Sequence, residues 1–430
     1  MFKTVLVASR REIAVRAIRT LKRLGIRSVA VFSDPDRNSR HVVDADVAIA
    51  LGGQTAAESY LDIERILRAA RDTGAEGIFP GYGFLSESAE FAEACEASGI
   101  AFIGPTPLQL REFGLKHRAR ELAQVAGVSM TPGTNLLASV DDAREAAARI
   151  GYPIMLKSTA GGGGIGLTRC DDEEGLIKAF ESVRRLGTQF FRDGGVFLER
   201  FVDHARHIEV QIIGDGSGHV VALGERDCSL QRRNQKVVEE TPAPHLPEKT
   251  RRALLDSAVK LGESVQYRSA GTVEFIYDGA RDEFYFLEVN TRLQVEHPVT
   301  ESVTGLDLIE LMLRISSGAP VDWQRVAEPP RGASFEVRLY AEDPLKNFQP
   351  SPGVLTEVSF PPEARVDGWV STGTEVSPFY DPMIAKLIVV AEDRASALEK
   401  LRDALDRTRL EGIATNLAYL RAIARAPEFY

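Results

Sequence analysis

The first 115 residues alternate between short apolar runs and amphipathic runs, which limits the folds open to the chain. We predict strands over residues 3–8, 28–32, 45–50, 77–80 and 101–103, and helices over residues 12–24, 61–73 and 91–98. Each helix is followed by a glycine, at Gly25, Gly74 and Gly99. Glycine is common there because it adopts the left-handed conformation without steric cost. Strands that alternate with helices favour a parallel, doubly wound sheet.

Two loops of this region carry functional hints. The first turn, Ala8–Glu12, has no Gly-x-Gly-x-x-Gly pattern, which argues against dinucleotide binding. The segment Gly81–Glu87 is a glycine-punctuated loop that follows a strand. Such loops often line sites, although this one is equally consistent with a tight turn before the next helix.

A glycine-rich segment follows the predicted strand at residues 152–158. Five of the six residues from Gly161 to Gly166 are glycine, and Lys157 lies just before them. No Gly-Lys-Ser/Thr follows, so the pattern differs from the P-loop. Backbone N–H groups in such a loop can wrap closely around phosphates. We interpret it as a flexible lid over ATP; a plain hairpin loop is the alternative. A further strand is predicted at residues 196–199.

Alternate residues with polar side chains follow a predicted apolar strand at residues 284–287. If extended structure continues, Glu288, Asn290, Arg292 and Gln294 project to one side, and Leu287, Val289 and Leu293 project to the other. Carboxylate and carbonyl oxygens suit Mg²⁺, and a guanidinium suits a planar oxyanion. We therefore predict a site for metal, phosphate and a small anion here, with Pro298 ending the strand.

The surrounding region supplies further candidates. Strands are expected at residues 207–213, 220–223 and 271–277, with Glu274 beside the Glu288 row as a second metal carboxylate. Residues 225–236 are polar and basic without apolar periodicity, which predicts a loop outside the core. Its Arg232, Arg233 and Lys236 could neutralise developing phosphate charge, or the loop could be merely solvated. A helix is expected at residues 306–316. Strands at 333–341 and 384–391 and a helix at 394–408 predict a smaller α+β unit.

Composition sets broad limits. A chain of 430 residues corresponds to about three domains. A net charge of −10 argues against non-specific nucleic-acid binding, and no apolar run is long enough for a membrane span. The three cysteines have no metal-binding spacing, and the N-terminus does not read as a signal peptide. We therefore expect a cytoplasmic protein.

Several segments together resemble the ATP-grasp enzymes of the biotin carboxylase family. They are Pro80–Glu87, Gly161–Gly166, Glu225–Glu240, Glu288–Glu301 and Ser351–Gly353, in the family's order. The resemblance covers essentially the whole chain. It implies an α/β and α+β architecture: a doubly wound N-terminal domain (1–115), an ATP-grasp domain (116–320) with a mobile glycine-rich lid (131–203), and a C-terminal α+β domain (331–430).

The resemblance also implies an ATP-dependent ligase that carboxylates biotin with bicarbonate through carboxyphosphate. The implied catalytic residues are Lys236, Arg292, Glu296 and Arg338. The implied ATP-binding residues are Lys116, Lys157, Gly161, Gly162, Gly163, Gly164, Gly166, Glu199, His207 and Gln231. Bicarbonate would be held by Arg292, Gln294 and the Val295 backbone, and Mg²⁺ or Mn²⁺ by Glu274, Glu288 and Asn290.

Within the family, the chain is most similar to the biotin carboxylase part of urea carboxylase, urea amidolyase and guanidine carboxylases, on segments 114–117, 156–167 and 282–290. No methionine is followed by lysine, so biotin is expected on another domain or chain, together with a carboxyltransferase. A homodimer is expected from the family. One departure is Arg11, which stands where the family's first motif has glycine.

Other readings remain open at this level. An acyl-CoA carboxylase subunit would share the same half-reaction. A carbamoyl-phosphate synthetase half or a carboxyaminoimidazole-type enzyme would share the lid and the metal carboxylates but not the Arg292–Glu296 segment. A non-catalytic subunit could keep the fold, although Lys236, Glu288, Arg292 and Glu296 are all present.

Overall fold

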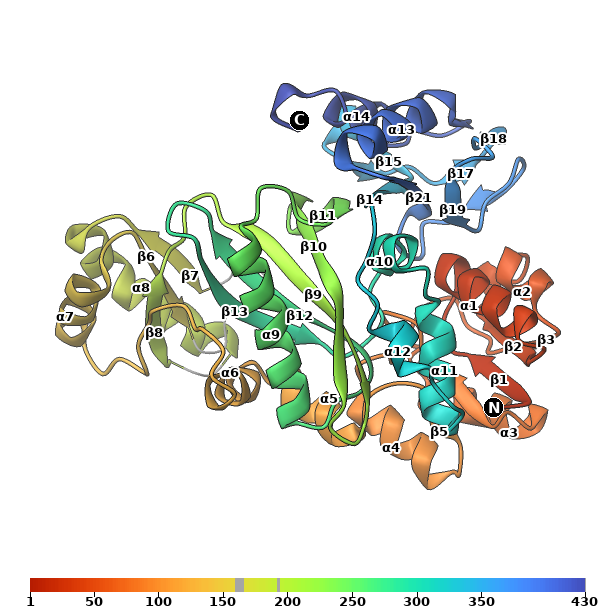
Figure 1. The fold of residues 1–430 in the computed structure, drawn as a ribbon, viewed down its shortest axis with the longest axis horizontal. Helices are drawn as coiled ribbons and strands as arrows, with labels where there is room; N and C mark the ends of the chain where they lie inside the picture. The colour runs from red at the N-terminus through yellow and green to blue at the C-terminus, as the bar shows by residue number, and fades with distance from the viewer. Residues whose placement is uncertain (159–165, 192–193, 430) are drawn as a thin grey trace. The chain divides into compact units, whose positions relative to one another are not determined.

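The computed structural model describes residues 1–158, 166–191 and 194–429 (Figure 1). Gly161, Gly162, Gly163 and Gly164 of the predicted lid lie outside the described residues, whereas Gly166 lies within them. Internal contacts divide the chain into two units. The first comprises residues 1–127, 207–275 and 287–430, and the second comprises residues 128–206 and 276–286.

The N-terminal part of the first unit is a five-stranded sheet in the order β3-β2-β1-β4-β5. All its pairings are parallel, as predicted. The strands are β1 Thr4–Val7, β2 Arg27–Phe32, β3 Val47–Ala50, β4 Gly77–Phe79 and β5 Ala101–Phe102. The helices are α1 Arg11–Arg23, α2 Arg40–Asp44, α3 Ile63–Thr73, α4 Ala89–Ala97, α5 Pro107–Gly114 and α6 Lys116–Val125. Gly74 ends α3 in the left-handed conformation, at φ +67°.

Arg11, the departure in the first turn, adopts the left-handed region that glycine would favour, at φ +50°. Its side chain is buried. The guanidinium lies 4.0 Å from the centroid of the Trp369 ring, and its Nη2 donates to Ser377 Oγ at 3.0 Å. The first turn therefore forms with arginine, and these contacts offset the strain of its backbone.

An eight-stranded sheet forms the rest of the first unit's framework and extends into the second through parts of β12 and β13. Its order is β13-β12-β9-β10-β11-β14-β21-β19. The strands are β9 Arg206–Asp215, β10 Val220–Arg232, β11 Gln235–Thr241, β12 Arg268–Asp278, β13 Glu283–Asn290, β14 Ala333–Tyr340, β19 Arg365–Gly368 and β21 Met383–Ala391. This sheet joins the predicted central segment to the predicted C-terminal segment without a break.

Helices and short strands complete the first unit. Helix α9 packs on β10, and α1 packs beside β19 (Figure 1). The helices are α9 Glu248–Ser264, α10 His297–Thr304, α11 Leu308–Ser317, α12 Trp323–Val326, α13 Arg394–Arg407 and α14 Leu417–Ile423. The short strands are β15 Glu342–Asp343, β16 Gln349–Pro350, β17 Gly353–Val354, β18 Glu357–Ser359, β20 Glu375–Val376 and β22 Arg409–Glu411.

The second unit is a three-stranded antiparallel sheet with two helices. Its order is β7-β6-β8. The elements are α7 Val140–Ile150, β6 Ile154–Ser158, β7 Leu167–Cys170, α8 Glu173–Phe191 and β8 Val196–Arg200. Apolar side chains from the helices and strands share one buried cluster.

Two sequence predictions about local structure were wrong. Residues 225–236 are not a loop outside the core: they belong to β10 and β11, and residues 223–228 are buried. Their polarity misled because several of the charged side chains meet an opposite charge on another element: Glu225 pairs with Arg251, Arg226 with Glu209, and Arg232 with Glu342. Strand β13 also ends at Asn290, and Pro298 lies in the first turn of α10, where proline is well tolerated. Leu287, expected in the core, is 37% exposed.

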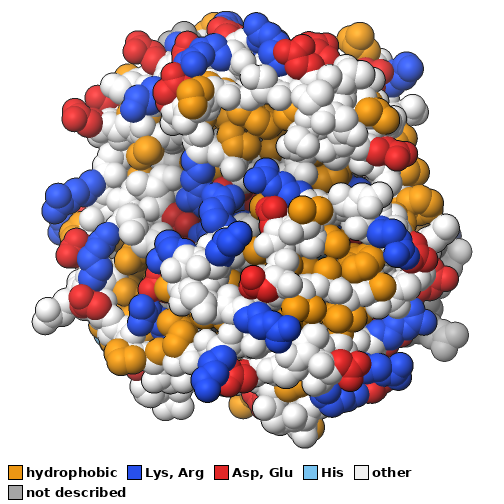
Figure 2. Space-filling model, turned by 90° about the vertical axis from the view of Figure 1, so that its right-hand side faces the viewer, with side chains coloured by type: hydrophobic (Ala, Val, Ile, Leu, Met, Phe, Trp, Pro, Cys, Tyr) orange, Lys and Arg blue, Asp and Glu red, His pale blue; other side chains and the backbone are white. Residues whose placement is uncertain are grey.

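Positive and negative side chains are interspersed over the face shown in Figure 2. Within the part of the chain that the structure describes, no helix has the length and apolar character needed to cross a bilayer.

Arg226 of β10 is a fully buried cation that connects β10 to β9, β12 and α10. Its guanidinium donates to Glu209 Oε1 at 2.6 Å and to Gln211 Oε1 at 2.7 Å on β9. It also reaches Thr272 of β12 at 3.2 Å, Gln294 at 2.8 Å and Thr300 of α10 at 3.0 Å. Every donor nitrogen of the side chain therefore has a partner, which is the condition for keeping a buried charge.

Replacing Arg226 with methionine should destabilise the chain by about 3–5 kcal/mol, because Glu209 would lose a buried partner. Urea unfolding measures this. Arg252→Met is the control, because Arg252 is 75% exposed in its pair with Glu248 and exposed ion pairs contribute little to stability. Equal effects of the two substitutions would contradict the role assigned to Arg226.

Candidate functional site

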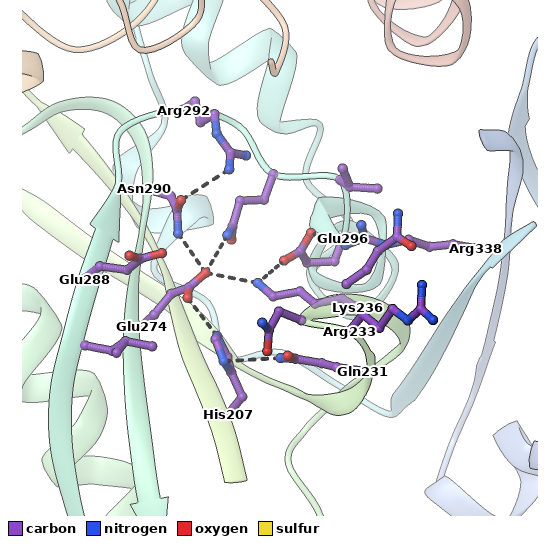
Figure 3. Close-up of a pocket in the computed structure, with 15 residues that line it drawn as sticks. His207, Gln231, Arg233, Lys236, Glu274, Glu288, Asn290, Arg292, Glu296 and Arg338 are labelled. Atoms are coloured by element: carbon purple, nitrogen blue, oxygen red, sulfur yellow. Dashed lines mark hydrogen bonds and ion pairs between the residues drawn. The ribbon is translucent and has the colours of Figure 1, made fainter. Parts of the chain in front are cut away.

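A cavity of about 520 Å³ opens beside the carboxyl end of β13 and the β10–β11 hairpin. It lies within the first unit, and Figure 3 shows the side chains that surround it. The cavity is lined by His207, Gln231, Arg233, Asn234, Gln235, Lys236, Glu274, Leu287, Glu288, Asn290, Arg292, Gln294, Val295, Glu296 and Arg338. All predicted catalytic, bicarbonate and metal residues are therefore brought together, as are His207 and Gln231.

Lys236 lies at the centre of this group. Its Nζ is 2.6 Å from Glu209 Oε2, 3.0 Å from Glu274 Oε1 and 2.7 Å from Glu296 Oε1 (Figure 3). Burial alone would lower the pKa of Lys236, but attraction by Glu209 and Glu296 outweighs it and raises the pKa well above the ordinary value. The ammonium is thus held protonated, with three carboxylates from three elements around it.

Glu296 is the carboxylate best placed to act as a base. Burial would raise its pKa, but the charges of Lys236 and Arg338 outweigh burial and hold the pKa well below its usual range. Arg338 Nη2 donates to Glu296 Oε2 at 3.0 Å, and Arg338 Nε donates to Glu239 Oε1 at 2.6 Å. Glu296 is therefore ionised and oriented by two cations at neutral pH.

Arg292 is held at the rim of the cavity. Its Nη2 donates to Asn290 Oδ1 at 3.2 Å, and its Nε donates to Glu87 Oε2 at 3.1 Å. Glu87 also accepts from the backbone N–H of Thr291 at 3.1 Å. The sequence did not decide whether the loop at residues 81–87 lines a site or is a tight turn. In the structure, its Glu87 carboxylate orients Arg292, the predicted anion-binding arginine.

Glu274 and Glu288 form an oxygen-rich wall opposite Arg338 (Figure 3). Glu274 accepts from Asn290 Nδ2 at 2.7 Å and lies 2.8 Å from His207 Nε2. Burial and the charge of Glu274 raise the pKa of Glu288. A divalent cation beside these oxygens would relieve that repulsion, so the donor set fits Mg²⁺.

Two other groupings could hold a metal on geometry alone. They are His207, Glu209 and Glu274, and Glu209, Cys228 and Glu296. The ammonium of Lys236 already contacts Glu209, Glu274 and Glu296. A cation therefore already balances these carboxylates.

Among the other predicted ATP residues that the structure describes, Lys116, Lys157, Gly166 and Glu199 do not line this cavity. Lys116 begins α6, and its charge acts to lower the pKa of Glu288. Lys157 of β6 and Glu199 of β8 lie in the second unit and form an ion pair of 2.5 Å. Gly166 follows the undescribed segment, and its carbonyl accepts from the Ser158 N–H.

Sequence reasoning named Arg233 as a candidate to neutralise phosphate charge, but it missed Asn234 and Glu239. Arg233 and Asn234 form the two-residue turn between β10 and β11, and both have positive φ, as a type I′ hairpin requires. The Arg-Asn pair between two strand-forming runs was an available signal. Glu239 was missed because the polar run hid the strand on which it lies.

A second cavity of about 360 Å³ shares Gln235, Val295 and Arg338 with the first. Its wall is more aromatic and includes Tyr82, Phe84 and Tyr380. Arg338 therefore faces both a highly charged space and a more apolar one.

Replacing His207 with glutamine should reduce stability more in weak acid than in weak base. Burial alone would lower the pKa of His207, but the hydrogen bond and charge of Glu274 outweigh it, so the pKa is raised above the ordinary 6.5. The histidine of the unfolded chain binds its proton less tightly than His207 does in the folded chain. The stabilisation that the protonated His207–Glu274 pair gives the fold is therefore complete below pH 6.5 and is lost as pH rises through the folded-state pKa.

The measurement is urea unfolding of wild type and variant at about pH 6 and about pH 9, either side of the unperturbed histidine pKa. His245→Gln is the control, because the His245 side chain is exposed. A difference between wild type and His207→Gln that grows with pH would contradict the assigned pairing.

Three family models match the chain in succession. Residues 1–110 match the biotin carboxylase N-terminal domain, residues 116–324 match the carbamoyl-phosphate synthase L chain ATP binding domain, and residues 336–430 match the biotin carboxylase C-terminal domain. The predicted architecture, with its ATP-grasp and C-terminal parts, is thereby confirmed.

Curated proteins that are similar over the full length of this chain agree with these family matches. The urea amidolyase of Saccharomyces cerevisiae is 59% identical over 429 residues, covering 100% of this chain and 23% of that protein. The chain thus spans less than a quarter of that relative. Biotin carboxylase 2 of Bacillus subtilis is 48% identical, covering 100% of this chain and 97% of its own length.

Solved structures point the same way. The biotin carboxylase domain dimer of Hydrogenobacter thermophilus 2-oxoglutarate carboxylase, in complex with MgADP, ADP and bicarbonate, matches with a TM-score of 0.90 and 42% identity. It covers 100% of this chain and 95% of that one. With the family's domains in order and its residues gathered in one cavity, the chain belongs to the biotin carboxylase family of ATP-dependent ligases.

Proposed function

We propose that this chain is the biotin carboxylase component of a urea carboxylase or urea amidolyase system. The observation that carries the proposal is the single cavity in which Lys236, the carboxylates of Glu274 and Glu288, and the Arg292–Glu296 segment converge. The urea assignment rests on similarity, which is higher to yeast urea amidolyase (59%) than to the stand-alone biotin carboxylase (48%).

In the proposed reaction, bicarbonate is phosphorylated by ATP to carboxyphosphate, and its CO₂ is transferred to N1′ of biotin. Arg292, Gln294 and the Val295 N–H hold bicarbonate, and Glu296 removes its proton. Lys236 stabilises charge on the transferred phosphoryl group, as cations do in phosphoryl transfer. Arg338 stabilises the biotin enolate. The low pKa of Glu296 and the raised pKa of Lys236 support these roles, because each group has the charge its step needs.

The nucleotide is assigned to two sets of residues. Lys116, Lys157 and the glycines at 161–164 and 166 hold the phosphates, while Glu199, His207 and Gln231 contact the nucleoside. We propose residues 131–203 as a lid, within domains spanning 1–115, 116–320 and 331–430. The compact second unit, residues 128–206 and 276–286, supports this division.

Glu274, Glu288 and Asn290 would hold Mg²⁺ or Mn²⁺ at the phosphates. The raised pKa of Glu288 supports a cation there, because a nearby positive charge would favour the ionised carboxylate. The relative from Hydrogenobacter thermophilus was solved with MgADP and bicarbonate, which fits the same pair of ligands.

Biotin would be supplied by a separate carrier domain, and the acceptor would meet it at a carboxyltransferase. The second cavity, of about 360 Å³, is proposed as the space for the biotin ring because its aromatic wall adjoins Arg338. A homodimer is proposed from the dimeric relative. A cytoplasmic setting is proposed because Cys95, Cys170 and Cys228 are all free and buried.

The first experiment is ATP hydrolysis by the chain with Mg²⁺ and bicarbonate, with and without free biotin. Hydrolysis that depends on bicarbonate and is stimulated by biotin is expected. ATP binding without turnover would contradict the catalytic assignment.

The acceptor requires reconstitution with the carrier and carboxyltransferase parts. The expected result is ATP consumption coupled to urea, with guanidine as the second acceptor to test. Carboxylation of acetyl-CoA or propionyl-CoA, without any response to urea or guanidine, would favour the acyl-CoA carboxylase alternative and overturn the urea proposal.

Lys236→Gln should lower kcat by roughly 10²–10³ while leaving the KM for ATP close to the wild-type value. The side chain acts on charge that develops in the transition state, so its removal affects turnover more than nucleotide binding. Steady-state kinetics over ATP and bicarbonate measures both constants. Lys260→Met, on the exposed face of α9, is the control. A large rise in KM for ATP with unchanged kcat would contradict the role.

A further inference from the structure

Lys386 of β21 is a fully buried lysine that the proposed reaction does not use. Its Nζ donates to the backbone carbonyl of Val295 at 2.7 Å and lies 3.0 Å from Glu12 Oε1. Lysine is rarely buried completely unless it is paired, so its position calls for a specific role.

The carbonyl it holds belongs to the peptide that joins Val295 to Glu296. These residues lie between the end of β13 and the start of α10, in a turn that the His297 N–H closes by donating to the Gln294 carbonyl at 3.3 Å. The preceding carbonyl, that of Gln294, lies 2.7 Å from the ring Nδ1 of His297, which is also fully buried. Two successive carbonyls are thus held by buried side chains, while Val295 and Glu296 line the cavity.

We propose that Lys386 is a positioning residue for bicarbonate: by holding the Val295 carbonyl, it fixes the Val295–Glu296 peptide, which anchors the adjoining Gln294–Val295 peptide with its N–H toward the anion and directs Glu296 toward the proton it removes. The inference rests on the proposed roles of Val295 and Glu296. It adds a residue on β21 that does not line the cavity to the residues that determine affinity for bicarbonate.

The charge of Lys386 is maintained by its surroundings. Burial would lower the pKa of Lys386, but Glu12, Glu336 and Asp367 outweigh burial and raise it. The ammonium therefore stays a strong donor to the Val295 carbonyl, and charge-assisted hydrogen bonds of this kind are about twice as strong as neutral ones.

A purely structural role is the competing explanation, because Lys386 also neutralises buried Glu12. The two roles separate in a double variant. Glu12→Gln/Lys386→Met removes both charges of the pair, and exchanging a buried ion pair for neutral groups is often close to neutral for stability. The double variant still lacks the donor to the Val295 carbonyl. It should therefore regain stability over Lys386→Met but not regain affinity for bicarbonate.

The test is steady-state ATP hydrolysis by the full chain, with bicarbonate varied at saturating ATP and then ATP varied at saturating bicarbonate. Lys386→Met and the double variant should each raise the KM for bicarbonate by about tenfold or more, with the KM for ATP within about twofold of wild type. Lys400→Met is the matched control. The Lys400 Nζ donates to the Val390 carbonyl of the same strand at 2.9 Å, but it is exposed.

Each result decides the inference. A double variant with wild-type KM for bicarbonate overturns the positioning role and leaves the proposed function standing. A wild-type chain without bicarbonate-dependent hydrolysis overturns both. If Lys386→Met does not fold, the double variant decides alone. If the double variant does not fold either, Lys386 is a structural residue and the proposal is wrong.

Discussion

The site depends on one ammonium group shared by three carboxylates. Lys236 brings together Glu209 of β9, Glu274 of β12 and Glu296 at the start of α10. Without that cation, three buried negative charges would repel one another, and at least one would take up a proton. The arrangement keeps Glu296 ionised at neutral pH. The charge of Lys236 therefore both balances the buried carboxylates and keeps Glu296 ionised beside it.

A second buried cation, Arg226, shares the carboxylate of Glu209 with Lys236. Arg226 contacts Glu209 and Gln294, both of which also adjoin Lys236 or its partners. Glu209 is thus held by two cations, and its position determines where the Lys236 ammonium lies. The charged groups at the base of the cavity are therefore each held by more than one hydrogen bond. At its rim, Arg292 contacts Asn290, the Leu293 carbonyl and the exposed Glu87.

Much of this could be predicted from the sequence, for identifiable reasons. The parallel sheet followed from apolar runs and glycine helix ends. Glu288, Asn290, Arg292 and Gln294 line one cavity, although β13 ends at Asn290 and Leu287, predicted for the opposite side, lines the cavity too. The β10–β11 hairpin could not be predicted from periodicity, because its polar residues are balanced by charges distant in sequence. Arg226 looked like a loop residue, yet it is fully buried. Local patterns do not reveal such pairs.

Strand register explains why the C-terminal segment belongs to the site. Strands β11 and β14 pair with Val238 opposite Val337 and Glu239 opposite Glu336. That register turns Arg338 toward Glu239 and Glu296, and a slip of one residue would point it to the other face of the sheet. The next pairing, of β14 with β21, places Lys386 opposite Arg338. Arg338 and Lys386 then act on adjacent parts of one short segment, the first on the Glu296 side chain and the second on the Val295 carbonyl. Val295 and Glu296 are therefore held by Lys386 of β21 and Arg338 of β14, two side chains that lie far from them in the sequence.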